Sequence, residues 1–276
     1  MATACAPLAA LHLRIERLQG VRRRARVATA ALAAAAVALV AWSLHAILVA
    51  DTDWSRVTLA GVARAVGRFA ALDVALLPEL ARPALDTALM ATLGTLAGAV
   101  LALPVAWLGA RNVTPAGGAS YLLARGLMTI SRSVHEIVWA LLFVAAAGLG
   151  SLAGVLALAV RSVGFVSKTV AEAIEDVDPG PVEAMRAVGA TRLQVLRYAI
   201  LPQVVPVVLG NLVFEWDINV RRATIMGLVG AGGLGLALFR QMAASSSGGI
   251  SAVVVVILAL ILVGEVASHH ARKALV

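Results

Sequence analysis

Charged residues are scarce in this chain, and cysteine is almost absent. Only 14% of the 276 residues are charged and 61% are hydrophobic, whereas about 25% of the residues of a soluble domain are usually charged. So few polar groups cannot cover the surface of a soluble protein, which indicates an integral membrane protein. The single cysteine, Cys5, excludes an internal disulfide framework and a cysteine-rich metal site. The length is that of one domain.

The patterns that carry catalysis and nucleotide binding are also missing. The histidines have no metal-ligand spacing and no nucleophile stands with a general base, so we predict no catalytic residue and no metal site. GFVSKT at 164–169 lacks the glycine that a phosphate-binding loop carries before its lysine. GLVGAGGLG at 227–235 contains G-x-G-x-x-G, but an apolar segment precedes it and no acidic residue lies between Asp217 and Glu265. We therefore predict no nucleotide cofactor in this chain.

Long apolar runs without charge are the main feature that is present. Five runs would put the chain ends on opposite sides of a membrane, yet both ends are basic, and basic ends favour the cytoplasm. Because glycines and a serine at 148–151 interrupt the third run, we divide it into spans at about 128–147 and 152–170. This predicts six spans, two cytoplasmic termini, and a net charge of +8 that sets topology and binds no nucleic acid. The five runs are 27–50, 87–109, 137–160, 198–214 and 242–264.

The N-terminal part divides into three predicted segments. Residues 1–26 form a basic cytoplasmic N-terminus. Residues 27–50 form the first transmembrane helix, because this run is long enough to span about 30 Å of hydrocarbon and too long for the core of a cleaved signal peptide. Residues 51–83 are an extracytoplasmic segment in which Arg64 and Arg68 share one helical face, a pattern that favours an interfacial helix.

A basic segment at 171–202, which six spans place in the cytoplasm, predicts two helices joined by a glycine turn. Asp178 and the following P-G-P end the preceding helix, and a short helix is expected at 183–188. Gly189 stops this helix where a left-handed residue is favourable, and Thr191 caps the next one. The result is a compact docking element on the cytoplasmic face.

The sequence of this element resembles the EAA loop of bacterial ABC-importer permeases. EAMRAVGATRLQVLRYAILP at 183–202 follows the pattern E-A-A, three residues, G, nine residues, I-x-L-P. Methionine replaces the third residue and alanine stands at the isoleucine position. In that family the loop is the coupling helix, which sits in a cleft of the ATPase subunit. The resemblance implies these ATPase-coupling residues: Glu183, Ala184, Met185, Gly189 and Pro202.

Three further stretches extend the resemblance to permeases of phosphonate importers of the PhnE type, over residues 84–273. They are RSVHEIVWALLFVAAAGLG, IEDVDPGPVEAMRAVGA and NVRRATIMGLVGAGGLG, and His135 stands where that family has asparagine. The resemblance implies an all-α polytopic membrane protein, with about six transmembrane helices in the ABC type I importer permease fold. It also implies a homodimer in the bacterial cytoplasmic membrane. Its partners would be two ABC ATPase subunits, which hold ATP and Mg, and an extracytoplasmic phosphonate-binding protein.

Charges in the fifth span are candidates for a translocation path. Asp217 and Arg221 are four residues apart, so we expect them to form an ion pair within one helix, which leaves Arg222 without a local partner. Because an anion crossing the bilayer would gain from a guanidinium group, Arg222 is the first candidate. Arg132 and Glu136 on the third span are next, as a pair or gate.

The glycine-rich stretch has two interpretations, and the function has several. We expect an outer glycine turn that either lines a cavity or is a flexible external turn without substrate contact. The same fold would serve import of phosphite, phosphate esters or methionine-like compounds. An ion-coupled secondary transporter is disfavoured because no repeat pairs two broken helices. A membrane enzyme acting on lipid phosphates would lack a nucleophile–base pair. The turn glycines are Gly230, Gly232, Gly233 and Gly235.

Overall fold

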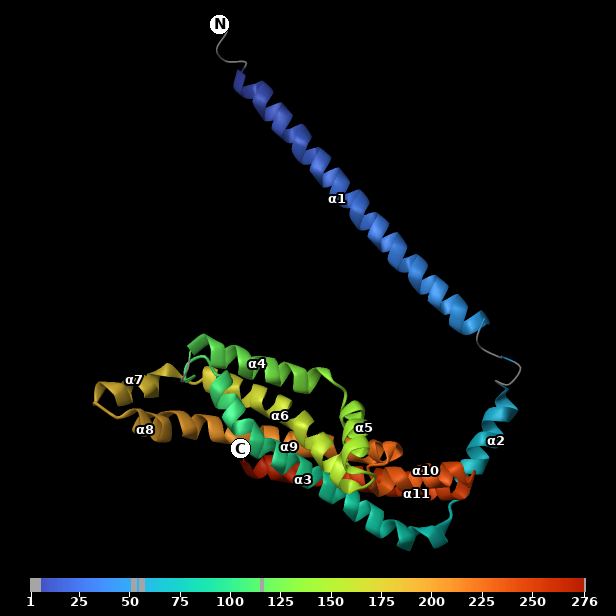
Figure 1. Ribbon diagram of the computed structural model, residues 1–276. Helices are drawn as coiled ribbons and strands as arrows, with labels where there is room; N and C mark the ends of the chain where they lie inside the picture. The colour runs from blue at the N-terminus through green and yellow to red at the C-terminus, as the bar shows by residue number, and fades with distance from the viewer. Residues whose placement is uncertain (1–5, 51–53, 55–57, 115–116, 276) are drawn as a thin grey trace. The chain divides into compact units, whose positions relative to one another are not determined.

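Helices make up every regular element of the residues that the computed structural model describes, which are 6–50, 54, 58–114 and 117–275 (Figure 1). The chain divides into two compact units, Met1–Ala65 and Val66–Val276. In the first unit, α1 (Ala6–His45) continues into a short π-helix, Ala46–Ala50. Cys5 and part of the predicted extracytoplasmic segment, at 51–53 and 55–57, lie outside the described residues.

The second unit is a helical bundle centred on α6 (Ser151–Glu175), which packs against four other helices. Small residues allow the helices to approach closely, as is usual in membrane proteins. Gly94 and Gly98 of the longest of the four lie against Leu158 and Ser162 of α6. The four helices are α3 (Leu77–Gly109), α4 (Gly117–Ser133), α5 (Glu136–Ala147) and α9 (Leu201–Met226). The remaining longer helices are α10 (Gly233–Ala243) and α11 (Ser247–Leu275).

Five described helical segments are long and apolar enough to cross a membrane, or six if one bent pair counts as a single span. The bent pair is α4 with α5, whose axes differ in direction by 91°. The predicted span at about 128–147 is not a single helix, because the helix breaks between Ser133 and Glu136, and it falls within this bent pair. The division at 148–151 is confirmed, since α5 ends at Ala147 and α6 begins at Ser151.

Other predicted boundaries shift by several residues. The second span begins earlier than residue 87, because α3 starts at Leu77, directly after a short 3-10 helix at Val74–Leu76. The last run, predicted at 242–264, belongs to two helices, since α10 ends at Ala243 and α11 starts at Ser247. The expected helix within 51–83 exists as α2 (Leu59–Ala70).

Candidate functional site

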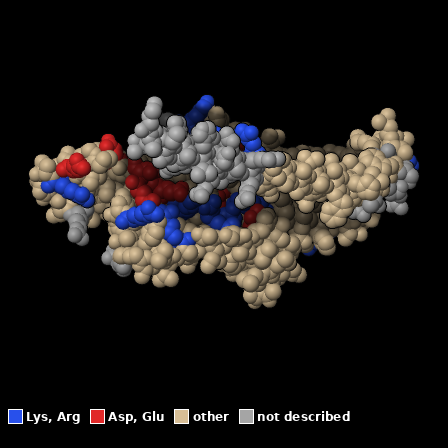
Figure 2. Space-filling view, turned by 90° about the horizontal axis from the view of Figure 1, so that it is seen from above, with Lys and Arg blue, Asp and Glu red and all other residues tan. Residues whose placement is uncertain are grey.

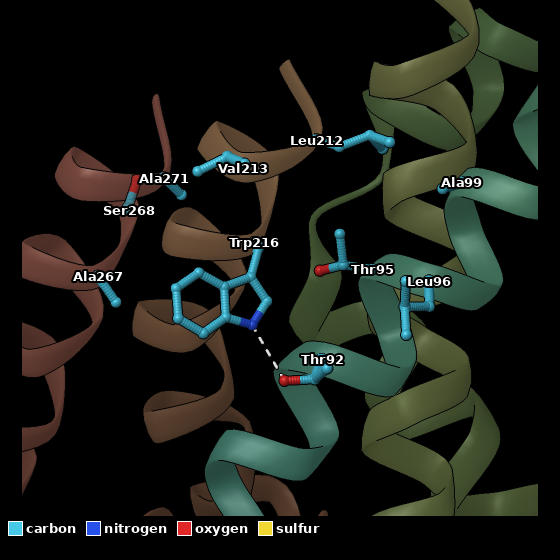
Figure 3. A pocket seen from close by; sticks show the side chains of 10 residues that line it. All are labelled: Thr92, Thr95, Leu96, Ala99, Leu212, Val213, Trp216, Ala267, Ser268 and Ala271. Carbon is cyan, nitrogen blue, oxygen red and sulfur yellow. Dashed lines mark hydrogen bonds between the residues drawn. The ribbon is translucent and has the colours of Figure 1, made fainter. Parts of the chain in front are cut away.

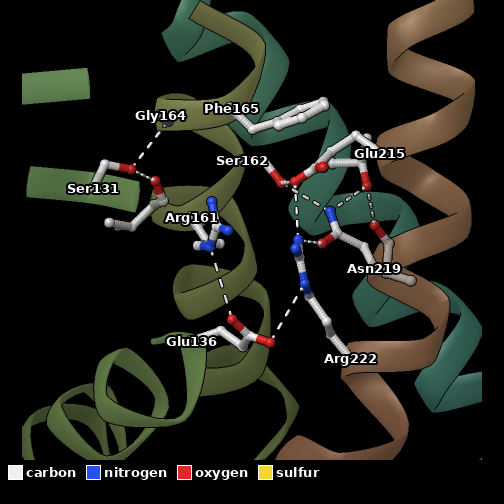
Figure 4. A network of polar contacts seen from close by, with 12 residues as sticks. Ser131, Glu136, Arg161, Ser162, Gly164, Phe165, Glu215, Asn219 and Arg222 are labelled. Carbon is white, nitrogen blue, oxygen red and sulfur yellow. Dashed lines mark hydrogen bonds and ion pairs between the residues drawn. The ribbon is translucent and has the colours of Figure 1, made fainter. Parts of the chain in front are cut away.

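A cluster of charged and polar side chains lies between α5, α6 and α9 inside the bundle (Figure 4). On α9, Glu215, Asn219 and Arg222 are spaced at i, i+4 and i+7, which puts them on one face of the helix. α6 contributes Arg161 and Ser162, and the first residue of α5 is Glu136. Figure 2 shows Lys and Arg side chains next to Asp and Glu side chains within a largely uncharged surface.

Glu215 is the fixed centre of this cluster. Its side chain is fully buried, and Oε1 accepts hydrogen bonds from Ser162 Oγ at 2.9 Å and Arg222 Nη1 at 3.2 Å. Arg222 Nη1 also donates to Asn219 Oδ1 at 3.2 Å. The Asn219 amide nitrogen in turn donates to Thr95 Oγ1 at 2.9 Å and to Ser162 Oγ at 2.8 Å. Hydrogen bonds from α6 and α9 therefore hold Oε1 of the buried carboxylate, and Asn219 connects this network to Thr95 of α3.

Glu136 is held differently. Its Oε1 lies 3.4 Å from Arg222 Nε and its Oε2 lies 3.7 Å from Arg161 Nε. Both contacts are longer than the 2.7–2.9 Å typical of charge-assisted hydrogen bonds, and the carboxylate accepts no hydrogen bond from a described residue. Arg161 Nη1 is buried and has no hydrogen-bond partner among the described residues. The carboxylate thus lies between two guanidinium groups but accepts a hydrogen bond from neither of them.

The predicted pairing of Arg132 with Glu136 is not found. Because the helix ends at Ser133, the two residues lie on different helices, and Glu136 faces Arg161 and Arg222 instead. Arg132 is exposed, lies over Gly164 of α6, and makes no side-chain ion pair or hydrogen bond among the described residues.

The prediction that Arg222 lacks a partner is also wrong. It forms ion pairs with Glu215 and Glu136 and is only 18% exposed. The expected Asp217–Arg221 pair is confirmed, with Arg221 Nη2 at 2.9 Å from Asp217 Oδ2. Arg221 also lies 3.7 Å from Glu265 of α11, so this pair joins α9 to α11 and stands apart from the cluster.

The glycine-rich stretch forms a buried turn and the start of a helix. Gly230, Gly232 and Gly233 have φ angles of 93°, 86° and 64°, which L side chains rarely adopt. The carbonyl of Gly230 accepts a hydrogen bond from the Gly150 backbone amide at 3.0 Å. Gly233 and Gly235 belong to α10, so the predicted turn is shorter than expected. Buried glycines that pack on neighbouring backbone do not fit the interpretation as a loose external turn.

The segment at 171–202 has the helix–glycine–helix form that the sequence predicts, with an earlier start. α7 spans Pro179–Ala187, where the prediction was 183–188, because Asp178 caps it by accepting a hydrogen bond from the Gly180 amide at 2.9 Å. Gly189 follows with φ 78°. The short α8 (Arg192–Val195) comes next, after Thr191. Of the predicted coupling residues, Met185 is half-buried and the others are exposed: Glu183, Ala184, Gly189 and Pro202.

A polar clamp next to this element was not predicted from the sequence. Glu175 Oε1, at the end of α6, accepts hydrogen bonds from Arg125 Nη2 and from the Arg111 backbone amide, both at 2.8 Å. Arg125 and Arg111 both lie over the Tyr121 ring at 5.3 Å. The hydrogen bond that Arg111 Nε donates to the Tyr121 hydroxyl at 2.9 Å raises the pKa of Arg111. Glu175 lies 50 residues from Arg125 and 64 residues from Arg111 in sequence, so no local sequence pattern predicts these contacts.

An apolar cavity of about 270 Å³ lies between α3, α9 and α11 (Figure 3). Trp216 Nε1 donates to Thr92 Oγ1 at 3.0 Å across it. Its lining is almost entirely apolar and includes no charged residue. It therefore does not suit an anion, and the charge cluster is the better candidate site.

The bundle, together with the helix–turn–helix of α7 and α8, has the fold of an ABC-importer permease. The chain resembles a solved chain of the MetNI methionine ABC transporter in an inward-facing conformation, with a TM-score of 0.65 and 23% identity. The match covers 74% of this chain and 100% of that chain. At this identity the likeness concerns the fold.

Sequence comparison identifies the family. Residues 94–274 match the family described as binding-protein-dependent transport system inner membrane component, and the chain belongs to it. The phosphite transport system permease protein PtxC of Stutzerimonas stutzeri is 49% identical over 157 residues, which are 57% of each chain. An Escherichia coli relative, 45% identical over 84 residues (30% of this chain and 69% of its own), has a name that refers to a cryptic phosphonate transport system permease, PhnE2. This chain thus spans a little over half the length of PtxC.

Proposed function

We propose that this chain is the permease subunit of an ABC importer that carries phosphonate anions across the bacterial cytoplasmic membrane. The observation that carries the proposal is the placement of Arg161 and Arg222 beside a loosely held carboxylate in the centre of the bundle. Guanidinium groups bind phosphorus oxyanions with two parallel hydrogen bonds. Two relatives named for phosphite and phosphonate transport support cargo of this class.

The chain performs no bond chemistry in this mechanism. Two copies of it enclose a cavity that opens alternately to either side, and two partner ATPase subunits bind ATP and Mg. α7 and its glycine turn seat in the ATPase, so that closure of the ATPase pair moves α6 and α9, the helices on either side of the coupling element. A separate extracytoplasmic binding protein supplies the affinity for cargo and delivers it to the outer mouth.

The cluster residues have different roles in this proposal. Arg222, Arg132 and Glu136 line the translocation path, and Arg161 joins them. Asp217 and its partner on α9 instead hold α9 against α11, since Arg221 also reaches Glu265 of that helix.

The topology belongs to the same proposal. The α4–α5 pair serves as the third of six spans, so that both basic termini and the segment at 171–202 face the cytoplasm. A fusion reporter that is active only in the cytoplasm, placed after residue 276 and after residue 148, tests this arrangement. Activity at the first position and none at the second is the expected result.

Growth on a phosphonate tests the function. A bacterium that lacks its own permease receives this chain with the ATPase and binding protein encoded beside it, and methylphosphonate is the sole phosphorus source. We expect the native chain to restore growth and Gly189→Asp to abolish it, because α7 then loses its left-handed turn residue. Gly118→Asp is the matched control, since Gly118 is exposed with no atom near its added side chain and has no positive φ angle. Growth with Gly189→Asp would contradict coupling through this loop.

Phosphite is the second candidate cargo. The observation that favours it is the 49% identity to a relative named for phosphite transport. In the same strain, growth on phosphite without growth on methylphosphonate would support the permease function and would identify phosphite, not phosphonate, as the cargo. This requires a host that oxidises phosphite after uptake, so the host carries an enzyme for that step.

A further inference from the structure

Two carboxylates share the charge cluster, and they are held in unequal ways. Glu215 is fully buried and accepts hydrogen bonds from two side chains, so removing it would leave those donors unpaired. The Glu136 side chain is 15% exposed and is held by ion pairs at 3.4 and 3.7 Å and by a 3.8 Å contact with Nε2 of its neighbour His135. Of the two, Glu136 is the carboxylate that can leave its place without breaking a hydrogen bond.

The arginine side chains in this region are not fully paired within the described part of the chain. Arg161 keeps one buried nitrogen without a hydrogen-bond partner among the described residues. The Arg132 side chain lies over Gly164 of α6, three residues after Arg161, and its guanidinium forms no ion pair within the described part of the chain. Two arginines, Arg161 of α6 and Arg222 of α9, thus flank one loosely held monoanion (Figure 4), and Arg132 of α4 lies over the same part of α6.

We propose that Glu136 is an exchangeable counter-ion: a tetrahedral oxyanion displaces its carboxylate from Arg161 and Arg222 and binds between these two arginines. This inference deepens the proposed function and rests on it. A phosphonate dianion carries more charge than a carboxylate and presents three oxygens, so it satisfies donors that Glu136 leaves unpaired. When the anion leaves, Glu136 returns and compensates the arginines. The exchange keeps cargo affinity low, which a translocation path requires.

The position of Glu136 suits this exchange. It is the first residue of α5, directly after the break in the helix pair, so its backbone is not part of the α4 helix that carries Arg132. The guanidinium of Arg222 keeps its hydrogen bonds to Glu215 and Asn219 when Glu136 moves away. The cation therefore stays in place while its second partner changes.

Binding of methylphosphonate to the full-length chain in lipid nanodiscs tests the proposal. Glu136→Gln removes the competing charge and nearly preserves the shape, and we expect it to tighten binding by at least about tenfold, equivalent to about 1.4 kcal/mol. Glu136→Asp keeps the charge but withdraws it by one methylene, so binding tightens by a smaller factor. Glu265→Gln is the matched control, because it removes a carboxylate at the same 3.7 Å from an arginine outside the cluster and leaves binding unchanged.

The outcomes separate the two proposals. The counter-ion proposal is supported if Glu136→Gln increases the affinity for methylphosphonate most, Glu136→Asp increases it less, and Glu265→Gln leaves it unchanged. No tightening in either Glu136 variant overturns it, and the Asp variant keeps the test decisive if the Gln variant fails to fold. Equal tightening in Glu265→Gln also overturns it, because the effect would then be general electrostatics. If the native chain restores growth on methylphosphonate but the Glu136 variants do not bind methylphosphonate more tightly, the importer function is supported. Only the role of Glu136 as an exchangeable counter-ion is then refuted.

Discussion

Replacing Gly98 by alanine should destabilise the bundle where α3 contacts α6. A Cβ atom at Gly98 would lie 2.5 Å from Ser162 Cβ and 2.9 Å from the Ala159 carbonyl oxygen of α6. Ordinary contact begins at 3.4 Å, so α3 and α6 must separate by about 0.9 Å (3.4 minus 2.5). A carbonyl on the helix backbone cannot turn away as a flexible side chain can.

The magnitude follows from two opposing effects. Overpacking of a dense core costs about 1–3 kcal/mol, and a backbone clash places this site near the upper value. Alanine favours a helix over glycine by about 1 kcal/mol, which offsets part of the loss. The expected net loss is about 2 kcal/mol, or a fall in melting temperature of roughly 4–8 °C for a chain of this size. Ser162 moves with α6, so its hydrogen bond to Glu215 lengthens as well.

Thermal unfolding of the detergent-solubilised chain measures this effect. Gly126→Ala is the matched control, because Gly126 lies in α4 with no atom within 4 Å of its added Cβ. It should leave the melting temperature unchanged or raise it slightly through helix propensity. Equal melting temperatures for Gly98→Ala and Gly126→Ala would refute the reasoning that α3 and α6 need glycine where they meet.

Three further substitutions test the parts around the cluster. Glu175→Gln weakens the clamp to Arg125 and should cost about 1–2 kcal/mol of stability by thermal unfolding; an unchanged melting temperature would contradict the clamp. Asp217→Asn removes an intrahelical ion pair that is half exposed on its arginine side and should cost about 0.5 kcal/mol by the same measurement, with growth on methylphosphonate retained. Gly235→Ala places a Cβ against the Thr224 carbonyl and Gly227 backbone, so expression of folded protein should fall; a normal yield in size-exclusion chromatography would argue against that packing.

Features set by neighbouring residues were predictable from the sequence. The glycine turn at Gly189 follows from a left-handed requirement at the end of one short helix. The Asp217–Arg221 pair follows from the four-residue spacing of a single helix. The start of α7 was misplaced by four residues because the cap by Asp178 outweighed the later proline as the start signal.

Contacts between distant segments were not predictable from one sequence. Glu215 meets Ser162 across 53 residues, and Asn219 meets Thr95 across 124 residues. Helical periodicity does place Glu215, Asn219 and Arg222 on one face of α9. It does not tell which helix that face meets, and for this reason Arg161 was missed as a member of the cluster.

The break between α4 and α5 explains why the local reasoning about Glu136 failed and why the cluster exists. In a continuous helix, Arg132 and Glu136 would be four residues apart on one face and would pair with each other. Instead, His135 adopts an extended conformation (φ −66°, ψ 142°) and its Nδ1 accepts a hydrogen bond from the Ile137 amide at 3.3 Å, which begins a new helix. The chain thereby gives up one short-range ion pair. Glu136 instead contacts Arg161 and Arg222. The guanidinium of Arg132 forms no ion pair or hydrogen bond with a described side chain.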